Sequence, residues 1–252
     1  MPLDSVRQKI ARSAEHLKTV ETEVQRYFHK KPCNVVAEFD TKSNRVIGKF
    51  VVTSPVPDSI PIILGDALQN LRSSLDYLIW ELVLAANGSP SEKHMFPICT
   101  TLDAFNNQIN RGRLDGVTPD ALAVIQAMQP YHMGQDAISH VLAVLDSFCN
   151  INKHRRILLT ALATHFSRTE IVSSTVGRSI QTTLSPRYHN AEIFASHAIT
   201  EGGEEMEMQG DAVFFVTFNE GAAKDIEIAN CTNLIWRFVD KAAIPSFERF
   251  FV

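Results

Sequence analysis

The run from Pro61 to Ala86 constrains the fold more than any other part of the sequence, because its apolar residues repeat with the period of an α-helix. They form one continuous face made of Leu64, Ala67, Leu68, Leu71, Leu75, Leu78, Ile79 and Leu82. A proline in the first turn and the Asn87-Gly88 pair after the last turn are typical of the two ends of a helix. We therefore predict a long amphipathic helix whose apolar face other elements must cover.

Helical patterns also occur at both ends of the chain and in its middle. A narrow apolar stripe among charges runs from Leu3 to about His29, and Thr118-Pro119-Asp120 is a good helix start. A further helix is expected from about Ile138 through the Leu158-Leu159 pair, and a short one from Asp103 to Asn110. The sequence thus predicts a helical core at about residues 3–29, 61–86, 118–165 and 225–250.

Runs of β-prone residues, separated by turn residues, lie between these helices. They are residues 35–39, 46–52, 171–176, 180–184, 193–199 and 213–218. The first two flank the polar segment 41–44, which predicts a hairpin. Because no repeat or low-complexity linker divides the chain, we expect one α+β domain over residues 1–252. In that domain an antiparallel β layer, at about 33–53 and 169–219, accompanies a helical bundle.

Charge and cysteine usage narrow the classes of function. The net charge of -4 and the pI near 6.1 give no general attraction for nucleic acid, so contact with RNA or DNA would need a local basic patch. The four cysteines are far apart and form no Cys-x-x-Cys pair, which argues against a zinc ribbon and indicates free, buried thiols. With a charged N-terminal helix and only short apolar runs, we expect a cytoplasmic protein with no membrane partner.

Several common enzyme motifs do not occur in the sequence. It contains no phosphate loop, Rossmann glycine pattern, nucleophile elbow or His-Glu-x-x-His helix. His132, His140 and His154 do not fall on one helical face, so we predict no metal site and no cofactor. The acidic stretch at residues 201–207 is interpreted as a solvated loop.

Polar residues interrupt two of the predicted helices. Those of the first are Asp66, Asn70, Arg72, Ser73, Asp76 and Tyr77. Those of the second are Asp146, Asn150, Lys153 and His154, on a helix that is otherwise apolar nearly all round. Arg72 and Asp76 have the i, i+4 spacing of an ion pair, and on an amphipathic helix they can be an ordinary surface pair. Buried charges need partners, so the second stripe indicates either a site or a polar network that fixes helix register.

The segments Gly65-Asp66-Ala67-Leu68-Gln69-Asn70-Leu71-Arg72-Ser73-Ser74-Leu75-Asp76-Tyr77 and Asn150-Ile151-Asn152-Lys153-His154-Arg155 resemble uncharacterised bacterial proteins related to the HEPN superfamily. That superfamily of helical bundles includes metal-independent ribonucleases of defence systems and inactive members. The resemblance covers roughly residues 61–159. It implies a HEPN-like bundle, a homodimer, and an RNA-directed role in defence or stress.

The catalytic signature of that superfamily is an arginine followed, after four to six residues, by a histidine. Arg72 matches the arginine, but Tyr77 stands at the place of the histidine, and a tyrosine is a poor general base at neutral pH. In an active protein, Arg72 would therefore hold the phosphate and His154 would transfer the proton, with Lys153 adding positive charge. We expect the polar residues around them, Asp66, Asn70, Asp76, Tyr77, Asp146 and Asn150, to have binding or orienting roles.

The alternative is a non-catalytic module that binds a nucleotide or small ligand, or that mediates assembly. The basic run from Lys153 to Arg156 allows the same two interpretations. It can contact a phosphate backbone, or it can cap buried carboxylates within the bundle.

Overall fold

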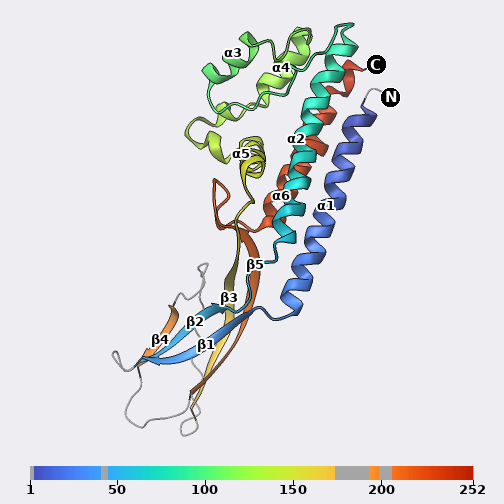
Figure 1. Ribbon diagram of the computed structural model, residues 1–252. Coiled ribbons are helices and arrows are strands. Elements are labelled where there is room, and N and C mark those ends of the chain that lie inside the picture. Colours follow the sequence, from blue (N-terminus) through green and yellow to red (C-terminus); the bar gives the residue numbers. More distant parts are fainter. Residues whose placement is uncertain (1–2, 41–44, 174–192, 199–205, 252) are drawn as a thin grey trace. The chain divides into compact units, whose positions relative to one another are not determined.

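The structure is a computed structural model that describes residues 3–40, 45–173, 193–198 and 206–251. The chain is α+β and mostly helical, with small antiparallel sheets (Figure 1). Its contacts divide it into two compact units: residues 1–22, 58–158 and 220–252 form unit 1, and residues 23–57 and 159–219 form unit 2. The expectation of one α+β domain over the whole chain stays a prediction.

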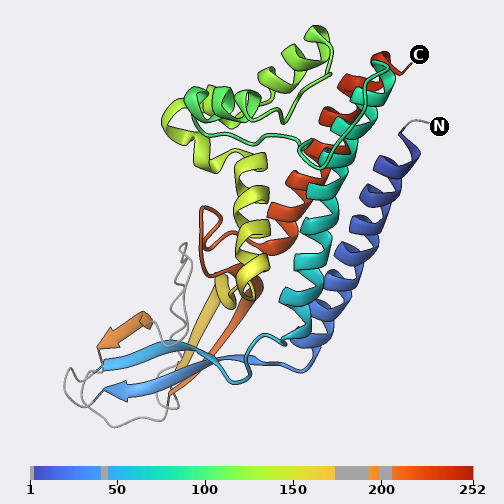
Figure 2. The same cartoon turned by 45° about the horizontal axis from the view of Figure 1, so that its top comes forward.

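Unit 1 contains the helices. They are most of α1 (Asp4–His29), α2 (Ser59–Ala85), α3 (Leu102–Asn110), α4 (Pro119–Ala127), α5 (Val141–His154) and α6 (Ile228–Arg237). A 3₁₀ segment, η1 (Pro130–Ser139), precedes α5, while a π turn, η2 (Phe238–Ala243), and a 3₁₀ segment, η3 (Ile244–Phe250), follow α6. Figures 1 and 2 show α1 and α6 lying alongside α2.

Helix α2 is the centre of unit 1, as its apolar face predicts. Every residue of that face is buried. The helix ends where the sequence indicates: Asn87 adopts the left-handed conformation with φ 58°, and the Gly88 N–H donates to the Val83 carbonyl at 2.8 Å. The main-chain acceptors of the last turn are thereby satisfied without a further turn of helix.

Helices α2 and α5 pack closely and run in opposite directions. Arg72 of α2 meets Asp146 of α5, while Gly65, two turns earlier, lies against Asn152, two turns later. A Cβ atom at Gly65 would come within 2.3 Å of the Asn152 side-chain oxygen. The glycine therefore allows the close approach of α5 that brings Asp146 to Arg72.

Local sequence signals start the helices between α2 and α6. Thr101 and Thr118 accept hydrogen bonds from main-chain N–H groups in the first turns of α3 and α4, and Pro119 occupies the first turn of α4. His140 caps α5 through Nδ1, which accepts from the Leu142 N–H. The predicted helix starts at Thr118 and near Asp103 are thus confirmed.

Unit 2 contains two antiparallel sheets. The first has the strand order β1 (Cys33–Asp40), β2 (Arg45–Val52) and β4 (Ile193–Ala198), and the second pairs β3 (Leu159–Ser173) with β5 (Met206–Phe218). The predicted hairpin of residues 35–39 and 46–52 is confirmed by the β1–β2 pairing. The rings of Phe50 and Phe214 stack at 5.5 Å within this unit.

One boundary was predicted wrongly. The helical core was expected to extend through residue 165, but α5 ends at His154, Arg155 is extended (φ -162°, ψ 167°), and Leu159 begins a strand of 15 residues. The predicted strand at 180–184 and residues 201–205 of the acidic loop lie outside the described residues, whereas Met206 and Glu207, also expected in that loop, are the first residues of β5. Within the described ranges, none of the helices combines the length and apolar character that a membrane span requires.

Candidate functional site

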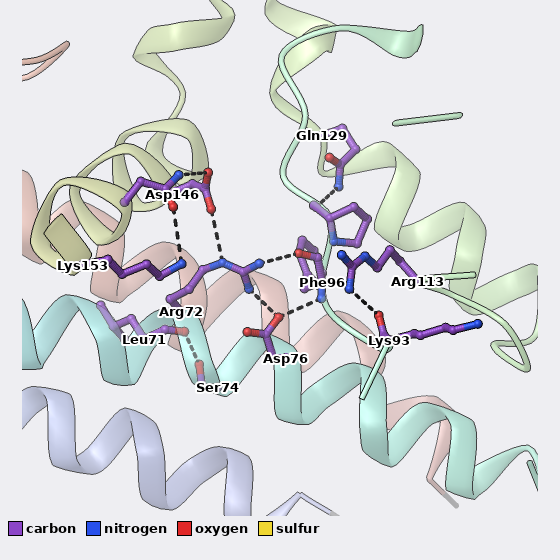
Figure 3. A network of polar contacts seen from close by, with 12 residues as sticks. Leu71, Arg72, Ser74, Asp76, Lys93, Phe96, Arg113, Gln129, Asp146 and Lys153 are labelled. Carbon is purple, nitrogen blue, oxygen red and sulfur yellow. Dashed lines mark hydrogen bonds and ion pairs between the residues drawn. The ribbon is translucent and has the colours of Figure 1, made fainter. Parts of the chain in front are cut away.

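The guanidinium of Arg72 is the centre of a polar network inside unit 1, and its side chain is only 10% exposed. Each of its three nitrogens donates to a protein oxygen. Nη1 contacts Asp76 Oδ1 at 2.5 Å, Nη2 contacts the Phe96 carbonyl at 2.9 Å, and Nε contacts Asp146 Oδ1 at 3.4 Å (Figure 3). The predicted Arg72–Asp76 ion pair is confirmed, but it is largely buried rather than a surface pair.

The network holds a buried segment that has no regular secondary structure. Asp76 accepts from the Phe96 N–H at 2.9 Å while Arg72 donates to the Phe96 carbonyl. Gln129, 1% exposed, continues this pattern: its amide donates to the Pro97 carbonyl at 2.9 Å and accepts from the Cys99 N–H at 3.0 Å. Buried main-chain groups need hydrogen-bond partners. Here the side chains of Arg72, Asp76 and Gln129 supply the partners that a neighbouring strand would supply in a sheet.

Gln129 was not among the residues predicted from the sequence. It lies between α4, which ends at Ala127, and the 3₁₀ segment η1, which begins at Pro130, and its own main chain is extended. A glutamine in a short connection just before a proline is a weak signal, since most such side chains are solvated. Only the packing of Pro97 and Cys99 against it gives Gln129 its role.

The electrostatics of the network are dominated by burial. Desolvation raises the pKa of the Asp76 carboxyl above its ordinary value, although the charge of Arg72 and the Phe96 N–H act in the opposite direction. Asp146 contributes a second carboxylate to the same arginine. The arrangement is therefore one cation shared by two carboxylates and a carbonyl, with Arg72 as the common donor.

The polar stripe of α5 leads from this network to the surface. Asp146 Oδ2 accepts from Asn150 Nδ2 at 3.0 Å, and Lys153 Nζ contacts Asn150 Oδ1 at 3.4 Å. Asn150 and Lys153 are both exposed. These contacts form a polar network between helices, with half-buried Asp146 as its inner end, and so favour the second of the two interpretations of this stripe.

The structure does not bring His154 to Arg72. His154 is exposed at the last position of α5, eight residues beyond Asp146, which corresponds to about 12 Å at 1.5 Å per residue of helix. Because α2 and α5 are antiparallel, the neighbour of this end of α5 is the start of α2 and not Arg72. A proton transfer by His154 to a phosphate held at Arg72 has no support in this geometry.

The basic run after Lys153 is engaged by carboxylates. Arg155 donates through both terminal nitrogens to both oxygens of Glu220, which also accepts from the Leu158 N–H at 2.6 Å. Arg156 forms an ion pair with Asp58 at 2.5 Å. All of these residues belong to unit 1. Glu220 is largely buried, so the Arg155 contact favours the interpretation that the run caps buried carboxylates, whereas Asp58 is exposed and does not fit it.

Asp66 and Asn70 lie apart from the Arg72 network. Asp66 is exposed on α2, and Asn70 donates from its amide to the Asp66 main-chain carbonyl at 2.8 Å. This bond is local to one turn of the helix. The two residues share a helix with Arg72 but no hydrogen bond that would connect them to it is found in the described part of the chain.

A second feature, on the other side of Asp76, is a pocket of about 460 Å³ between the start of α1, the second half of α2 and the segment after α2. We call it the Tyr77 pocket. Its lining includes Asp76, Tyr77, Trp80, Glu81, Glu92 and His94. Tyr77 and Trp80 are 42% and 44% exposed, and the Ser5 hydroxyl contacts Glu81 at 3.4 Å.

His94 fixes the loop wall of the Tyr77 pocket. Its Nδ1 accepts from the Ser91 N–H at 2.8 Å and its Nε2 lies 2.8 Å from the Asp115 carbonyl, which requires the proton on Nε2. Both ring nitrogens are therefore used by the main chain. His94 and Trp80 were not predicted as site residues; the signal for Trp80 was its position three residues after Tyr77, on the same side of α2.

The cysteines are not reactive groups. All four are buried and free, as predicted. Burial raises the pKa of Cys99 and Cys231 to about 11 and that of Cys149 to about 12, so their thiolates are scarce at neutral pH. Among the residues that the structure describes, no three His, Cys, Asp or Glu side chains form a group suited to a metal ion.

No protein-family model matches this chain, and no curated protein or solved structure matches it significantly. The function is therefore argued from the Arg72 network and the Tyr77 pocket alone.

Proposed function

We propose that this chain is a non-catalytic, HEPN-like helical protein that binds a small ligand in the Tyr77 pocket. The proposal rests on the burial of Arg72 and on the hydrogen bonds that its guanidinium already makes. An arginine that stabilises a scissile phosphate must direct N–H groups at the position of the phosphate. Here each nitrogen already donates to a protein oxygen, and the side chain is 10% exposed.

The proton-transfer residues support the same proposal. Tyr77 stands where the superfamily signature has histidine, and His154 lies about two turns of α5 from Asp146. A phosphate at Arg72 would also meet the carboxylates of Asp76 and Asp146, which repel it. The loss of nuclease chemistry thus agrees with a structural role of Arg72, which holds the Phe96 segment in place through a hydrogen bond to the main chain.

The Tyr77 pocket supports the ligand-binding part. Its volume of about 460 Å³ is in the range of small-molecule sites, and two large aromatic side chains are left exposed in its wall. Another cavity of about 580 Å³ includes Asp146, but there that carboxylate is already bonded to Arg72 and Asn150. The RNA partner and the homodimer implied by the resemblance stay predictions.

The ribonuclease question is tested by incubating purified protein with a mixed pool of tRNA and messenger RNA in EDTA, beside the His154→Ala variant. We expect no cleavage by either protein at high concentration. Cleavage by the parent that His154→Ala abolishes, with unchanged folding by circular dichroism, would overturn the non-catalytic proposal. Exposed His154 is suited to this test because its replacement leaves the core untouched.

The pocket is tested by thermal unfolding in a panel of cationic, neutral and anionic small molecules. We expect at least one class to raise the Tm of the parent but not of Trp80→Ala. Leu84→Ala is the matched control, because Leu84 is 47% exposed on the same helix and does not line the pocket. If no class raises the Tm, or if both variants respond like the parent, the Tyr77 pocket is not the binding site.

A further inference from the structure

One wall of the Tyr77 pocket is formed by two exposed aromatic side chains of α2. Tyr77 and Trp80 are three residues apart on α2 and each leaves more than two fifths of its surface exposed. Aromatic rings placed together in a concave site offer their electron-rich faces to a ligand. Such faces attract cations within about 6 Å of the ring centroid.

One cation of the protein itself already uses this wall. Lys9 of α1 places its Nζ over the Tyr77 ring, 5.5 Å from the centroid. The contact shows that the ring is oriented to accept positive charge at the edge of the pocket. Lys9 is not among the residues that line the cavity, so the cavity beside it is not filled by the lysine.

The charged side chains of the pocket also favour the binding of a cation. Asp76, Glu81 and Glu92 are in its lining, and the charge of Asp76 is balanced by Arg72. For Glu81 and Glu92, no ion pair is found among the described residues. Two carboxylates in a partly enclosed site produce a negative potential that concentrates cations and excludes anions.

Lysine and arginine, the residues that would attract an anion by charge, are not found in the lining of this pocket. It contains neither lysine nor arginine, as far as the described residues extend. His94 has both ring nitrogens bonded to the main chain, so it offers no donor to a phosphate. A nucleotide would place its phosphates against carboxylates, with Lys9 at the edge of the pocket as the one nearby cation that the contacts described here provide.

We infer that the Tyr77 pocket binds a small organic cation, an alkylammonium or guanidinium compound, with its charged head against Tyr77 and Trp80 and near Glu81 and Glu92. This inference rests on the proposed ligand-binding function and specifies its ligand class. The volume of about 460 Å³ exceeds that of a bare ammonium group, so the ligand carries an organic body as well.

The experiment uses Trp80 as the reporter. The chain has two tryptophans, so Trp236→Phe leaves Trp80 as the sole source of tryptophan emission. This protein is titrated with choline and agmatine, with 3,3-dimethylbutan-1-ol as the uncharged counterpart of choline, and with AMP as the anion. We expect at least one of the two cations to change the emission saturably, and neither the alcohol nor AMP to do so.

Variants then test the recognition that we infer. Tyr77→Leu should weaken cation binding about twofold to thirtyfold, the range of a cation–π contact, while Tyr77→Phe keeps the ring and the affinity. Glu92→Gln should weaken binding severalfold at low salt, and Lys9→Met should strengthen it severalfold by removing a like charge. Asp136→Asn, at an exposed position that does not line the pocket, is the control for loss of one negative charge.

The outcomes separate the two proposals. Saturable binding of the alcohol or of AMP, without binding of either cation, would overturn the inferred ligand class and leave the ligand-binding function in place. Binding of none of the four probes up to 10 mM, or cation binding unchanged by Tyr77→Leu, would overturn the cation inference. No thermal response to any class of compound would remove the proposed function as well.

Discussion

Two arginine sites in unit 1 have similar partners but very different surroundings. Arg72 is 10% exposed and joins Asp76, Asp146 and a main-chain carbonyl, whereas Arg155 and Arg156 are 52% and 48% exposed and join Glu220 and Asp58. The sequence suggested phosphate contact at both places. From the difference between the sites we expect burial, more than the identity of the partner, to decide how much an arginine contributes to stability.

The largest effect is expected at Arg72. Arg72→Met removes the cation, so Asp76 and Asp146 each lose one donor and their positive partner, and the Phe96 carbonyl loses the guanidinium donor; breaking a buried pair in this way costs about 3–5 kcal/mol. The free energy of unfolding, measured by urea denaturation, should fall by that amount. The matched control is Arg12→Met, because Arg12 is exposed and pairs only with Glu15 on its own helix. Equal losses in the two variants would contradict the importance given to burial.

An intermediate effect is expected at Glu220 and Asp76, whose contributions to stability should depend on pH in opposite directions. Burial acts to raise the pKa of Glu220, but the hydrogen bonds from Arg155 and the Leu158 N–H outweigh it, and the pKa lies below its ordinary value. Its contribution to stability is therefore present above about pH 4.5 and is lost as the pH falls through the lowered folded pKa. For Asp76, whose pKa is raised, the contribution is present below about pH 4 and is lost as the pH rises through the folded pKa.

The two carboxylates can be compared by measuring the free energy of unfolding from pH 3 to pH 7. Glu220→Gln should make the acid loss of stability shallower, and should cost about 1–3 kcal/mol at pH 7 through a weakened charged hydrogen bond. Asp76→Asn should make the acid loss steeper, because it removes a group that favours the folded state in acid. Parallel pH profiles for the two variants would show that the assigned directions are wrong.

The smallest effect is expected at Arg156. Its partner Asp58 is 74% exposed, so Arg156→Ala should lower the free energy of unfolding by less than about 1 kcal/mol, and added salt should reduce even that difference. Measurements of the parent and the variant at low and high ionic strength would check this. A loss as large as that of Arg72→Met would remove the contrast between the two sites.

The parts of the fold that depend on local signals were predictable. The apolar face and the Asn87-Gly88 end located α2, and Thr118 with Pro119 located the start of α4. The extent of α5 was not, because the apolar residues after His154 fit a buried helix and a buried strand equally well. Leu159 is a strand residue because it pairs with Phe218, and a partner 59 residues away leaves no local trace.

The site was predictable in its members more than in their roles. The i, i+4 spacing identified Arg72 with Asp76, and the stripe on α5 identified Asp146 with Asn150. That Arg72 donates to Phe96 depends on how a segment 24 residues away folds back, which spacing along one helix does not contain. The same is true of the Tyr77 pocket, whose loop wall is positioned by the His94 bond to Asp115.

The bond between the Leu158 N–H and Glu220 has a consequence for how the chain can be altered. Residues 159–219 leave unit 1 after Leu158 and return to it at Glu220, and these two residues are joined by a hydrogen bond of 2.6 Å. The two points at which this segment is connected to unit 1 therefore lie side by side. A short turn can bridge such neighbouring ends, so length changes in the segment, including its replacement, need not displace the helices that carry Arg72 and the Tyr77 pocket.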